Sequence, residues 1–302
     1  MAKIRGLEGR DVIEIIDLWN DCLQQDPVSR EGFRSRVVLS QGLDPSTCLV
    51  AEEDGRVIGF VFGTMQGKIG YLSVIFVSAG HRRKGIGTAL LEAFAMGVRA
   101  KGGTKLSITW GSGAVMPGVD WVAYPGALEF FSKNGFVEVD REAVAMSRSL
   151  MDYRTPKEVT ELEDKLRAEG YAFQQLNEER VLDLMQFLKA EFPGWENDPR
   201  GTLLRYPKNL DHILIALKGD KVVGYCQMAI DGLVEHFGPF AVAQSERNKG
   251  IGAVLFHNCL ATMQTKGARN VWFARGGGRN YSFYVRHGMK EMRRYVAMDK
   301  SL

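Results

Sequence analysis

One short motif occurs twice in this chain and constrains its fold more than any other feature. Arg-x-Lys-Gly-Ile-Gly occupies residues 82–87 and again residues 247–252, at an offset of 247 − 82 = 165 residues. A pattern that recurs at a fixed offset indicates a duplicated structural unit. A chain of 302 residues is long enough for two domains of ordinary size. The sequence therefore predicts two domains of one kind, at residues 1–155 and 156–302.

The same order of elements surrounds both copies of the motif. Each copy is preceded by two β-rich runs, separated by Asp-Gly at 54–55 or Gly-Asp at 219–220, which are hairpin signals. A third strand follows, at Tyr71–Val77 or His236–Val242. After each motif come apolar residues at helical spacing, another strand and a short helix. We expect a final strand to close each half, which gives an α/β fold with a mixed, mostly antiparallel sheet in each domain.

Composition excludes several classes of protein. A net charge of +3 argues against a dedicated nucleic-acid binder. The four cysteines form no CxxC pair and match no zinc spacing, so we expect no metal site, and Cys226 and Cys259 sit in apolar segments where burial is expected. No apolar run approaches the roughly 20 residues that span a bilayer, and the N-terminus lacks the apolar core of a signal peptide. We therefore expect a cytoplasmic protein without nucleic-acid or membrane partners.

The order of strand, basic glycine turn and helix suits an anion. Backbone N–H groups of the first helical turn point to one spot, with the helix dipole behind them. Glycine allows a phosphate to approach, because a side chain would hold it away. A lone glycine pair is equally consistent with a helix cap, but two copies in the same order favour a ligand. The dinucleotide fingerprint GxGxxG and the nucleotide loop GxxxxGK[ST] are both missing from the sequence.

Each half resembles the Gcn5-related N-acetyltransferase (GNAT) family, whose signature is [Arg/Gln]-x-x-Gly-x-[Gly/Ala]. The aromatic pairs Phe130-Phe131 and Phe283-Tyr284, each followed by a glycine and an apolar residue, are similar to the family's second motif. The resemblance covers nearly all of both halves and extends to tandem members of the family. It implies a sheet splayed between its fourth and fifth strands, with acetyl-CoA held in the gap.

The resemblance also implies which residues bind acetyl-CoA. Backbone amides of the glycine turns would hold the pyrophosphate, and the ends of the preceding strands would pair with the pantetheine amides. A backbone N–H there would also stabilise an oxyanion. The predicted residues are Phe76, Val77, Arg82, Arg83, Lys84, Gly85, Ile86, Gly87 and Thr88 in the first half, and Ala241, Val242, Arg247, Asn248, Lys249, Gly250, Ile251, Gly252 and Ala253 in the second, with Asn280, which is also a candidate N-cap.

The two halves differ where this family often places a catalytic acid and a catalytic base. Tyr284 matches the acid, whereas Phe131 at the equivalent position of the first half cannot donate a proton. Glu235 is a candidate base, and its equivalent 165 residues earlier is Gly70. Packing also explains the tyrosine, and a solvated strand edge also explains the glutamate. We predict that Tyr284 and Glu235 are catalytic and that the C-terminal domain is the working one.

Two loops are candidates for further roles. The first half has an insertion at Gly111–Pro125, and its residues Asp120 and Tyr124 leave catalysis in the first half open. In the second half, the loop Phe192–Asp198 carries Trp195 and is either part of an acceptor site or an ordinary loop with one buried anchor.

The function that these features favour is transfer of an acetyl group from acetyl-CoA to a primary amine of a small molecule, by direct attack on the thioester. Acetylation of a protein lysine or N-terminus is an alternative, and so is a non-catalytic role as a CoA-binding sensor or scaffold. Fusion of two like domains makes their pairing intramolecular. We therefore expect an internal pseudo-dimer, in a protein that is a monomer or a homodimer.

Overall fold

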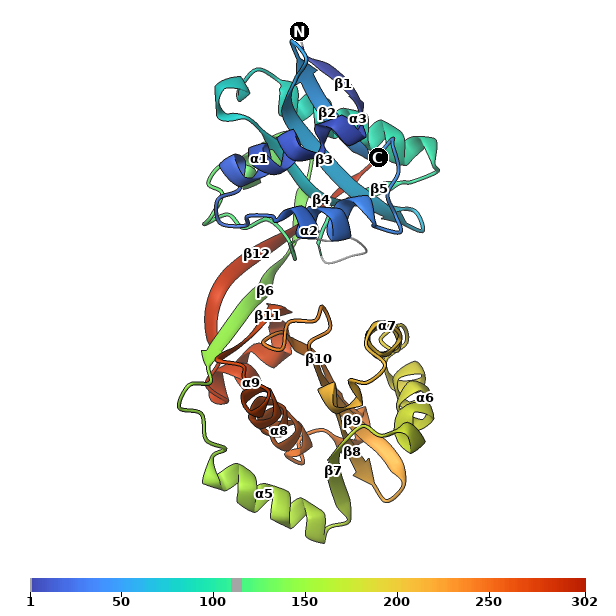
Figure 1. The fold of residues 1–302 in the computed structure, drawn as a ribbon, viewed down its shortest axis with the longest axis vertical. Helices are drawn as coiled ribbons and strands as arrows, with labels where there is room; N and C mark the ends of the chain where they lie inside the picture. The colour runs from blue at the N-terminus through green and yellow to red at the C-terminus, as the bar shows by residue number, and fades with distance from the viewer. Residues whose placement is uncertain (1, 110–115) are drawn as a thin grey trace. The chain divides into compact units, whose positions relative to one another are not determined.

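The computed structural model describes residues 2–109 and 116–302 (Figure 1). The chain forms two compact units that interleave along the sequence. The first unit comprises Met1–Val144, Ala274–Gly278 and Arg293–Leu302, and the second comprises Ala145–Phe273 and Arg279–Met292. The sequence predicts a single boundary near residue 155. In the structure the chain passes between the two units within each of the strands β6, β11 and β12.

The larger sheet is mixed. Its strands in spatial order are β1 (Lys3–Gly6), β2 (Cys48–Glu53), β3 (Arg56–Gln66), β4 (Ile69–Val77), β5 (Lys105–Ile108), β12 (Lys290–Ser301), β6 (Val137–Ser149) and β11 (Asn270–Gly276). The pairs from β1 to β4 are antiparallel, β4 and β5 are parallel, and β5 and β12 are antiparallel. The predicted mixed, mostly antiparallel sheet is confirmed.

The predicted hairpin between β2 and β3 is confirmed in its details. Glu53 pairs with Arg56 across the turn. The two turn residues, Asp54 and Gly55, have φ angles of 51° and 77°. Positive φ at both central positions matches the right-handed twist of the flanking strands, which is why Asp-Gly is favoured there.

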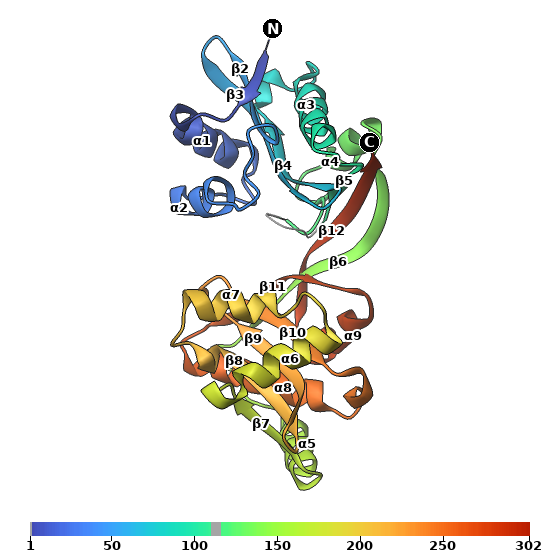
Figure 2. The ribbon, with the colours of Figure 1, turned by 90° about the vertical axis from the view of Figure 1, so that its right-hand side faces the viewer.

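Helices cover both faces of the first unit's sheet. α1 (Val12–Cys22) and α2 (Arg30–Phe33) pack on one face, and α3 (Ile86–Ala100) and α4 (Ala127–Lys133) pack on the other (Figure 2). Residues of β3 enter both cores: Phe60 and Phe62 pack with α1, whereas Val61 packs with α3. Burial on both faces explains why β3 is an almost continuous apolar run.

The second unit repeats the plan with a four-stranded sheet. Its elements are α5 (Lys157–Ala168), β7 (Tyr171–Gln175), α6 (Val181–Glu191), α7 (Asn197–Arg205), β8 (Ile213–Lys218), β9 (Lys221–Met228), β10 (Phe237–Val242), α8 (Ile251–Thr265) and α9 (Tyr281–Arg286), and its strands lie in the order β10-β9-β8-β7. α6 packs on this sheet through Leu184, Phe187 and Leu188. Cys226 and Cys259 are free and buried, as predicted. Within the described ranges, no helix is both long and apolar enough to cross a membrane.

The expectation that each half is closed by its own last strand is wrong. The C-terminal strand β12 pairs with β5, with Met298 opposite Ile108 and Ser301 opposite Lys105. Lys105 Nζ donates to Asp299 Oδ2 at 2.8 Å, and the Ser107 hydroxyl donates to the other carboxylate oxygen. The last ten residues of the chain therefore belong to the first unit. Alternating apolar residues make a strand but do not select its partner.

Candidate active site

The first glycine turn joins β4 to α3 with a backbone that few side chains tolerate. Arg83 has φ 62°, and Gly85, the N-cap of α3, has φ 81°. The left-handed conformation costs a residue with a Cβ atom about 1–2 kcal/mol, which explains the glycine. Arg82 Nε donates to the Val77 carbonyl at 2.9 Å and ties the turn to the end of β4. The first N–H groups of α3, which have no helical partner, lie at this turn.

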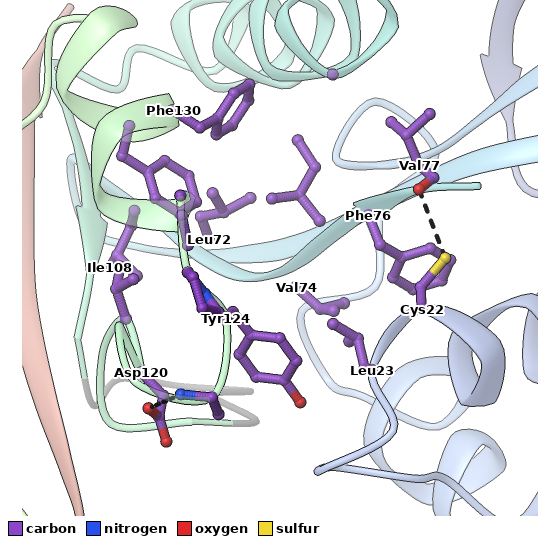
Figure 3. Close-up of a pocket in the computed structure, with 18 of the residues that line it drawn as sticks. Cys22, Leu23, Leu72, Val74, Phe76, Val77, Ile108, Asp120, Tyr124 and Phe130 are labelled. Atoms are coloured by element: carbon purple, nitrogen blue, oxygen red, sulfur yellow. Dashed lines mark hydrogen bonds between the residues drawn. The ribbon is translucent and has the colours of Figure 1, made fainter. Parts of the chain in front are cut away.

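A cleft of about 750 Å³ lies beside this turn (Figure 3). β4 and β5 pair from Ile69 opposite Lys105 to Tyr71 opposite Ser107, and β4 then continues to Val77 while β5 ends at Ile108. The strands therefore separate beyond Tyr71, as the predicted splay requires. The cleft is lined by both strands, the glycine turn, the loop after α1 and the segment before α4. Its volume is within the range of small-molecule and cofactor sites, roughly 300–1,000 Å³.

A β-bulge at Ser73 marks the point where the cleft begins. Phe62 pairs with Val74, but the next residue, Gly63, pairs with Leu72, so that Ser73 is the extra residue of β4. Its hydroxyl is buried and has no hydrogen-bond partner among the described residues, and Ser73 lines the cleft. A buried polar atom without a partner costs about 1–3 kcal/mol. Such an atom in a cleft wall indicates that a ligand group supplies the missing hydrogen-bond partner.

The residues of the first cleft fit a CoA-type ligand. Of the predicted set, those that line it are Phe76, Val77, Arg82, Arg83, Gly85, Gly87 and Thr88. Lys84 and Ile86 lie outside the lining, although Lys84 is exposed at the same turn. A Cβ atom built on Gly85 would meet nothing within 4 Å, so that the turn is open to an approaching phosphate. Two arginines at a helix N-terminus add the positive charge that a pyrophosphate needs.

The second glycine turn has the same backbone but a different neighbour. Asn248 has φ 63° and Gly250 has φ 92°, and Arg247 Nε donates to the Val242 carbonyl at 3.2 Å. Here a Cβ atom on Gly250 would lie 2.6 Å from the side chain of Leu162, which comes from α5. The Cβ side of Gly85 is therefore open, whereas the Cβ side of Gly250 faces Leu162, although Arg247, Asn248 and Lys249 of the second turn are exposed.

The basic residue of the second turn is also engaged. Lys249 Nζ lies 2.8 Å from Glu246 Oε2, and the Tyr171 hydroxyl donates to the same oxygen at 2.6 Å. An ion pair with Glu246 reduces the positive charge that Lys249 offers to an anion.

Aromatic side chains fill the second unit between β10 and β11. Phe237 of β10 and Phe273 of β11 have ring centroids 6.2 Å apart, and Tyr284 packs against Phe273 at 4.6 Å. Phe240 stacks on Phe283 at 5.7 Å. Each such pair adds stability beyond the area it buries. The second copy of the splay therefore contains a packed aromatic cluster.

The two predicted catalytic residues, Tyr284 and Glu235, have separate environments. Tyr284 is buried in the aromatic cluster, and burial raises the pKa of its hydroxyl, which stays protonated at neutral pH. Glu235 lies in the turn before β10, where its carbonyl accepts the N–H of Trp272 at 2.9 Å. Among the described residues, no hydrogen bond or ion pair joins the two side chains. Their catalytic roles stay predictions.

The remaining candidates have mixed environments. Asn280 occupies the N-cap position of α9 but makes no capping hydrogen bond through its side chain. Trp195 packs on Phe192 with centroids 5.3 Å apart but stays 40% exposed, so it is not a buried anchor. The insertion Gly111–Pro125 lies partly outside the described residues, but its residues Asp120 and Tyr124 both line the first cleft.

Sequence reasoning missed three residues that shape these sites: Leu162, Asp26 and Arg293. Leu162 has a signal, because Val159 and Leu166 lie three residues before it and four after it on an otherwise charged helix. Asp26 and Arg293 have none, because an ion pair between residues 267 positions apart leaves no local pattern.

Comparison with known proteins supports two domains of one family. A family model described as acetyltransferase (GNAT) domain matches residues 44–138, and one described as acetyltransferase (GNAT) family matches residues 181–289. No curated protein matches the chain significantly.

Several solved structures share the fold over the whole chain. A GCN5-related glucosamine N-acetyltransferase region of a fungal multi-domain GH3 beta-N-acetylglucosaminidase matches with TM-score 0.84 and 20% identity, covering 99% of this chain and 38% of that chain. This chain therefore spans well under half of that protein. A GCN5-related N-acetyltransferase from Sphaerobacter thermophilus matches with TM-score 0.75 and 17% identity, covering 99% and 95%. A tandem GNAT protein from the clavulanic acid biosynthesis pathway matches with TM-score 0.65 and 16% identity, covering 100% and 98%.

Proposed function

Because this chain belongs to the GNAT acetyltransferase family, as a member with two such domains in tandem, we propose that it transfers an acetyl group from acetyl-CoA to the primary amine of a small molecule, in the cleft of its first unit. The observation that carries this proposal is the difference between the two glycine turns. Gly85 lies beside a cleft and its Cβ side is open, whereas Leu162 packs against the Cβ side of Gly250.

The chain's own groups have distinct roles in this proposal. The N–H groups at the start of α3 and the side chains of Arg82 and Arg83 hold the pyrophosphate. Beyond Tyr71, the edge of β4 that faces the cleft pairs with no strand of the described residues, so its backbone groups pair with an extended ligand as a strand would. The Ser73 hydroxyl, which has no partner within residues 2–109 and 116–302, offers one further hydrogen bond at the bulge. Acetyl-CoA supplies the activated acyl group.

The other end of the cleft suits a polar acceptor. Gln24, Gln25, Asp120 and Tyr124 line it and offer both hydrogen-bond donors and acceptors. One structural relative is described as a glucosamine N-acetyltransferase region. An amino sugar is therefore the acceptor to test first, before simpler alkyl amines.

The prediction that Tyr284 and Glu235 form the active site of the second half is the competing hypothesis. Its support is a tyrosine that burial keeps protonated, as a catalytic acid must be. In this version the first cleft would hold CoA without turnover. Variants of the two glycine turns separate the hypotheses.

The test is the amine-dependent release of CoA thiol, measured for the wild type and for a matched pair of variants. Arg83 and Asn248 are equivalent residues with φ angles of 62° and 63°, so Arg83→Glu and Asn248→Glu add the same side chain on the same backbone. We expect Arg83→Glu to lower kcat/KM at least tenfold, because a charge-assisted contact to phosphate is lost, and Asn248→Glu to stay within twofold of the wild type. The reverse pattern would place the donor in the second half. Acetyl-CoA binding without turnover of any amine would favour the sensor or scaffold role.

A further inference from the structure

Four side chains from three distant segments meet beside the first cleft. Asp26 follows α1, Asp120 and Tyr124 precede α4, and Arg293 belongs to the C-terminal strand. Arg293 binds Asp26 through two parallel hydrogen bonds, Nη1 to Oδ1 at 2.6 Å and Nη2 to Oδ2 at 2.8 Å. Its Nε donates to Asp120, and the Tyr124 hydroxyl donates to Asp26 Oδ2. We call these four residues the Arg293 cluster.

The Arg293 cluster fixes the two loops that flank the cleft. The side chains of Asp120, Asp26 and Arg293 are 2%, 18% and 23% exposed, so the ion pairs are shielded from solvent. Asp120 Oδ1 also accepts the N–H groups of Val122 and Ala123, at 3.1 and 2.8 Å, and so holds the loop that carries Tyr124. The fork of a guanidinium fits two carboxylates at once, which a lysine cannot reproduce. Arg293 thereby holds both loops in one arrangement.

The hydrogen bonds leave the Tyr124 oxygen only one way to bind a ligand. Its single proton is donated to Asp26, so its lone pairs can only accept a hydrogen bond. Burial, and then the bond to Asp26, raise the pKa of Tyr124, and the phenol keeps its proton at neutral pH. Figure 3 shows the ring of Tyr124 in the cleft, between Asp120 and Leu23.

An oxygen that can only accept selects between the two reactants. The thioester end of the donor presents only hydrogen-bond acceptors, which gain nothing from this oxygen. An amine presents N–H groups. The Arg293 cluster also carries two carboxylates and one guanidinium, so its excess negative charge favours a cationic ammonium over an anionic group.

We infer that the Tyr124 hydroxyl binds the amine group of the acceptor, and that Arg293 is a positioning residue that holds Tyr124 through Asp26 and its loop through Asp120. This inference rests on the proposed function in the first cleft. It makes the C-terminal strand β12 part of the first active site, because Arg293 belongs to that strand. Arg293 lies 169 residues beyond Tyr124 in the sequence (293 − 124 = 169).

The test separates amine binding from donor binding and from stability. Tyr124→Phe keeps the ring and removes the accepting oxygen. We expect the KM for the amine to rise about five- to tenfold, which corresponds to one hydrogen bond, while the Kd for acetyl-CoA stays within twofold. Arg293→Met should raise the amine KM at least as much, and Arg293→Lys should restore part of the loss. Arg56→Met, which removes an exposed arginine whose Nε lies 3.6 Å from Glu14 Oε1, is the matched control and should change neither constant.

The outcomes are distinguishable. If Arg293→Met fails to fold, Tyr124→Phe alone decides the amine contact, and Arg293→Lys alone decides the positioning role. An unchanged amine KM in Tyr124→Phe, with turnover intact, overturns the inference and leaves the proposed function standing. Equal loss of amine and acetyl-CoA binding in the Arg293 variants, with a lowered Tm, shows a structural role and also overturns it. If the wild type acetylates no amine, the proposed function fails and the inference fails with it.

Discussion

The glycine turn at residue 85 and its copy at residue 250 have nearly the same backbone, yet their surroundings differ. Left-handed residues recur at the same positions, with φ 62° and 81° in one and 63° and 92° in the other. A Cβ atom on Gly85 would meet nothing within 4 Å, whereas one on Gly250 would lie 2.6 Å from Leu162. The motif therefore sets the shape of the turn, and the rest of the chain sets what packs against it.

The units also differ in what holds them together. Beside its cleft, the first unit has the Arg293 cluster, whose guanidinium stays charged at any ordinary pH. In the second unit, Nδ1 of the buried His257 lies 2.8 Å from the Tyr153 hydroxyl, and its Nε2 lies 2.9 Å from His287 Nδ1. The second unit therefore contains a buried pair of imidazoles in addition to its ion pairs.

The largest expected difference between the units is the loss of stability of the second unit at acidic pH. Burial lowers the pKa of His257 from 6.5 to about 3, and the pKa of His287 is also lowered by burial. The unfolded chain therefore binds more protons than the folded one below pH 6.5. The stability from neutral His257 is complete above pH 6.5 and is lost as the pH falls toward 3, by up to about 1.4 kcal/mol per pH unit.

We expect the free energy of unfolding of the second unit, measured with urea, to fall by about 1 kcal/mol or more between pH 7.0 and pH 5.5. His257→Phe removes the titrating group, and although its stability at pH 7.0 should be lower, its change with pH should be smaller. An equal change in both proteins would show that His257 does not cause the acid sensitivity.

A smaller effect concerns the cover over the second turn. Leu162→Ala shortens the side chain that lies against Gly250, while the aromatic cluster around Phe237 stays in place. The uncovered turn should accept a diphosphate but no pantetheine. Titration with ADP should therefore show one site in the wild type and a second, weaker site in Leu162→Ala.

The matched control is Glu161→Ala, because Glu161 is the exposed neighbour of Leu162 on α5. It should leave one ADP site. A single site in Leu162→Ala as well would show that the leucine is not what closes the second turn.

The smallest expected effect is that of Tyr284→Phe. In our proposal the donor binds in the first unit and this hydroxyl belongs to the second, so kcat for amine acetylation should stay within twofold of the wild type. If Tyr284 is the catalytic acid, its loss should instead lower kcat by roughly 10²–10⁴. The steady-state rate therefore chooses between the two halves.

Much of the fold was predictable because it depends on residues that are close together in the sequence. Asp54-Gly55 between β-rich runs predicted a hairpin, and Gly85 and Gly250 predicted where two helices begin, because these turns require particular residues. Both features depend on neighbouring residues. The second copy of the motif, at a fixed offset, supported the same prediction independently.

The rest depends on contacts between distant residues. β12 pairs with β5 rather than with a strand of its own half, and the partner of a strand is not encoded in its apolar alternation. Leu162 covers Gly250 from a helix that we took to be a connection between domains. Comparing Tyr284 with Phe131 favours the second half, and that stays a prediction, because a motif shows which groups are present but not where a cleft lies.

The central claim, that the donor binds in the first cleft, is tested most directly by calorimetric titration of acetyl-CoA into the wild type and two glycine variants. Gly85→Glu and Gly250→Glu impose the same kind of backbone strain at equivalent positions. Our account predicts one binding event in the wild type, its loss in Gly85→Glu and its retention in Gly250→Glu. Retention in Gly85→Glu with loss in Gly250→Glu would contradict the account and return the active site to Tyr284 and Glu235.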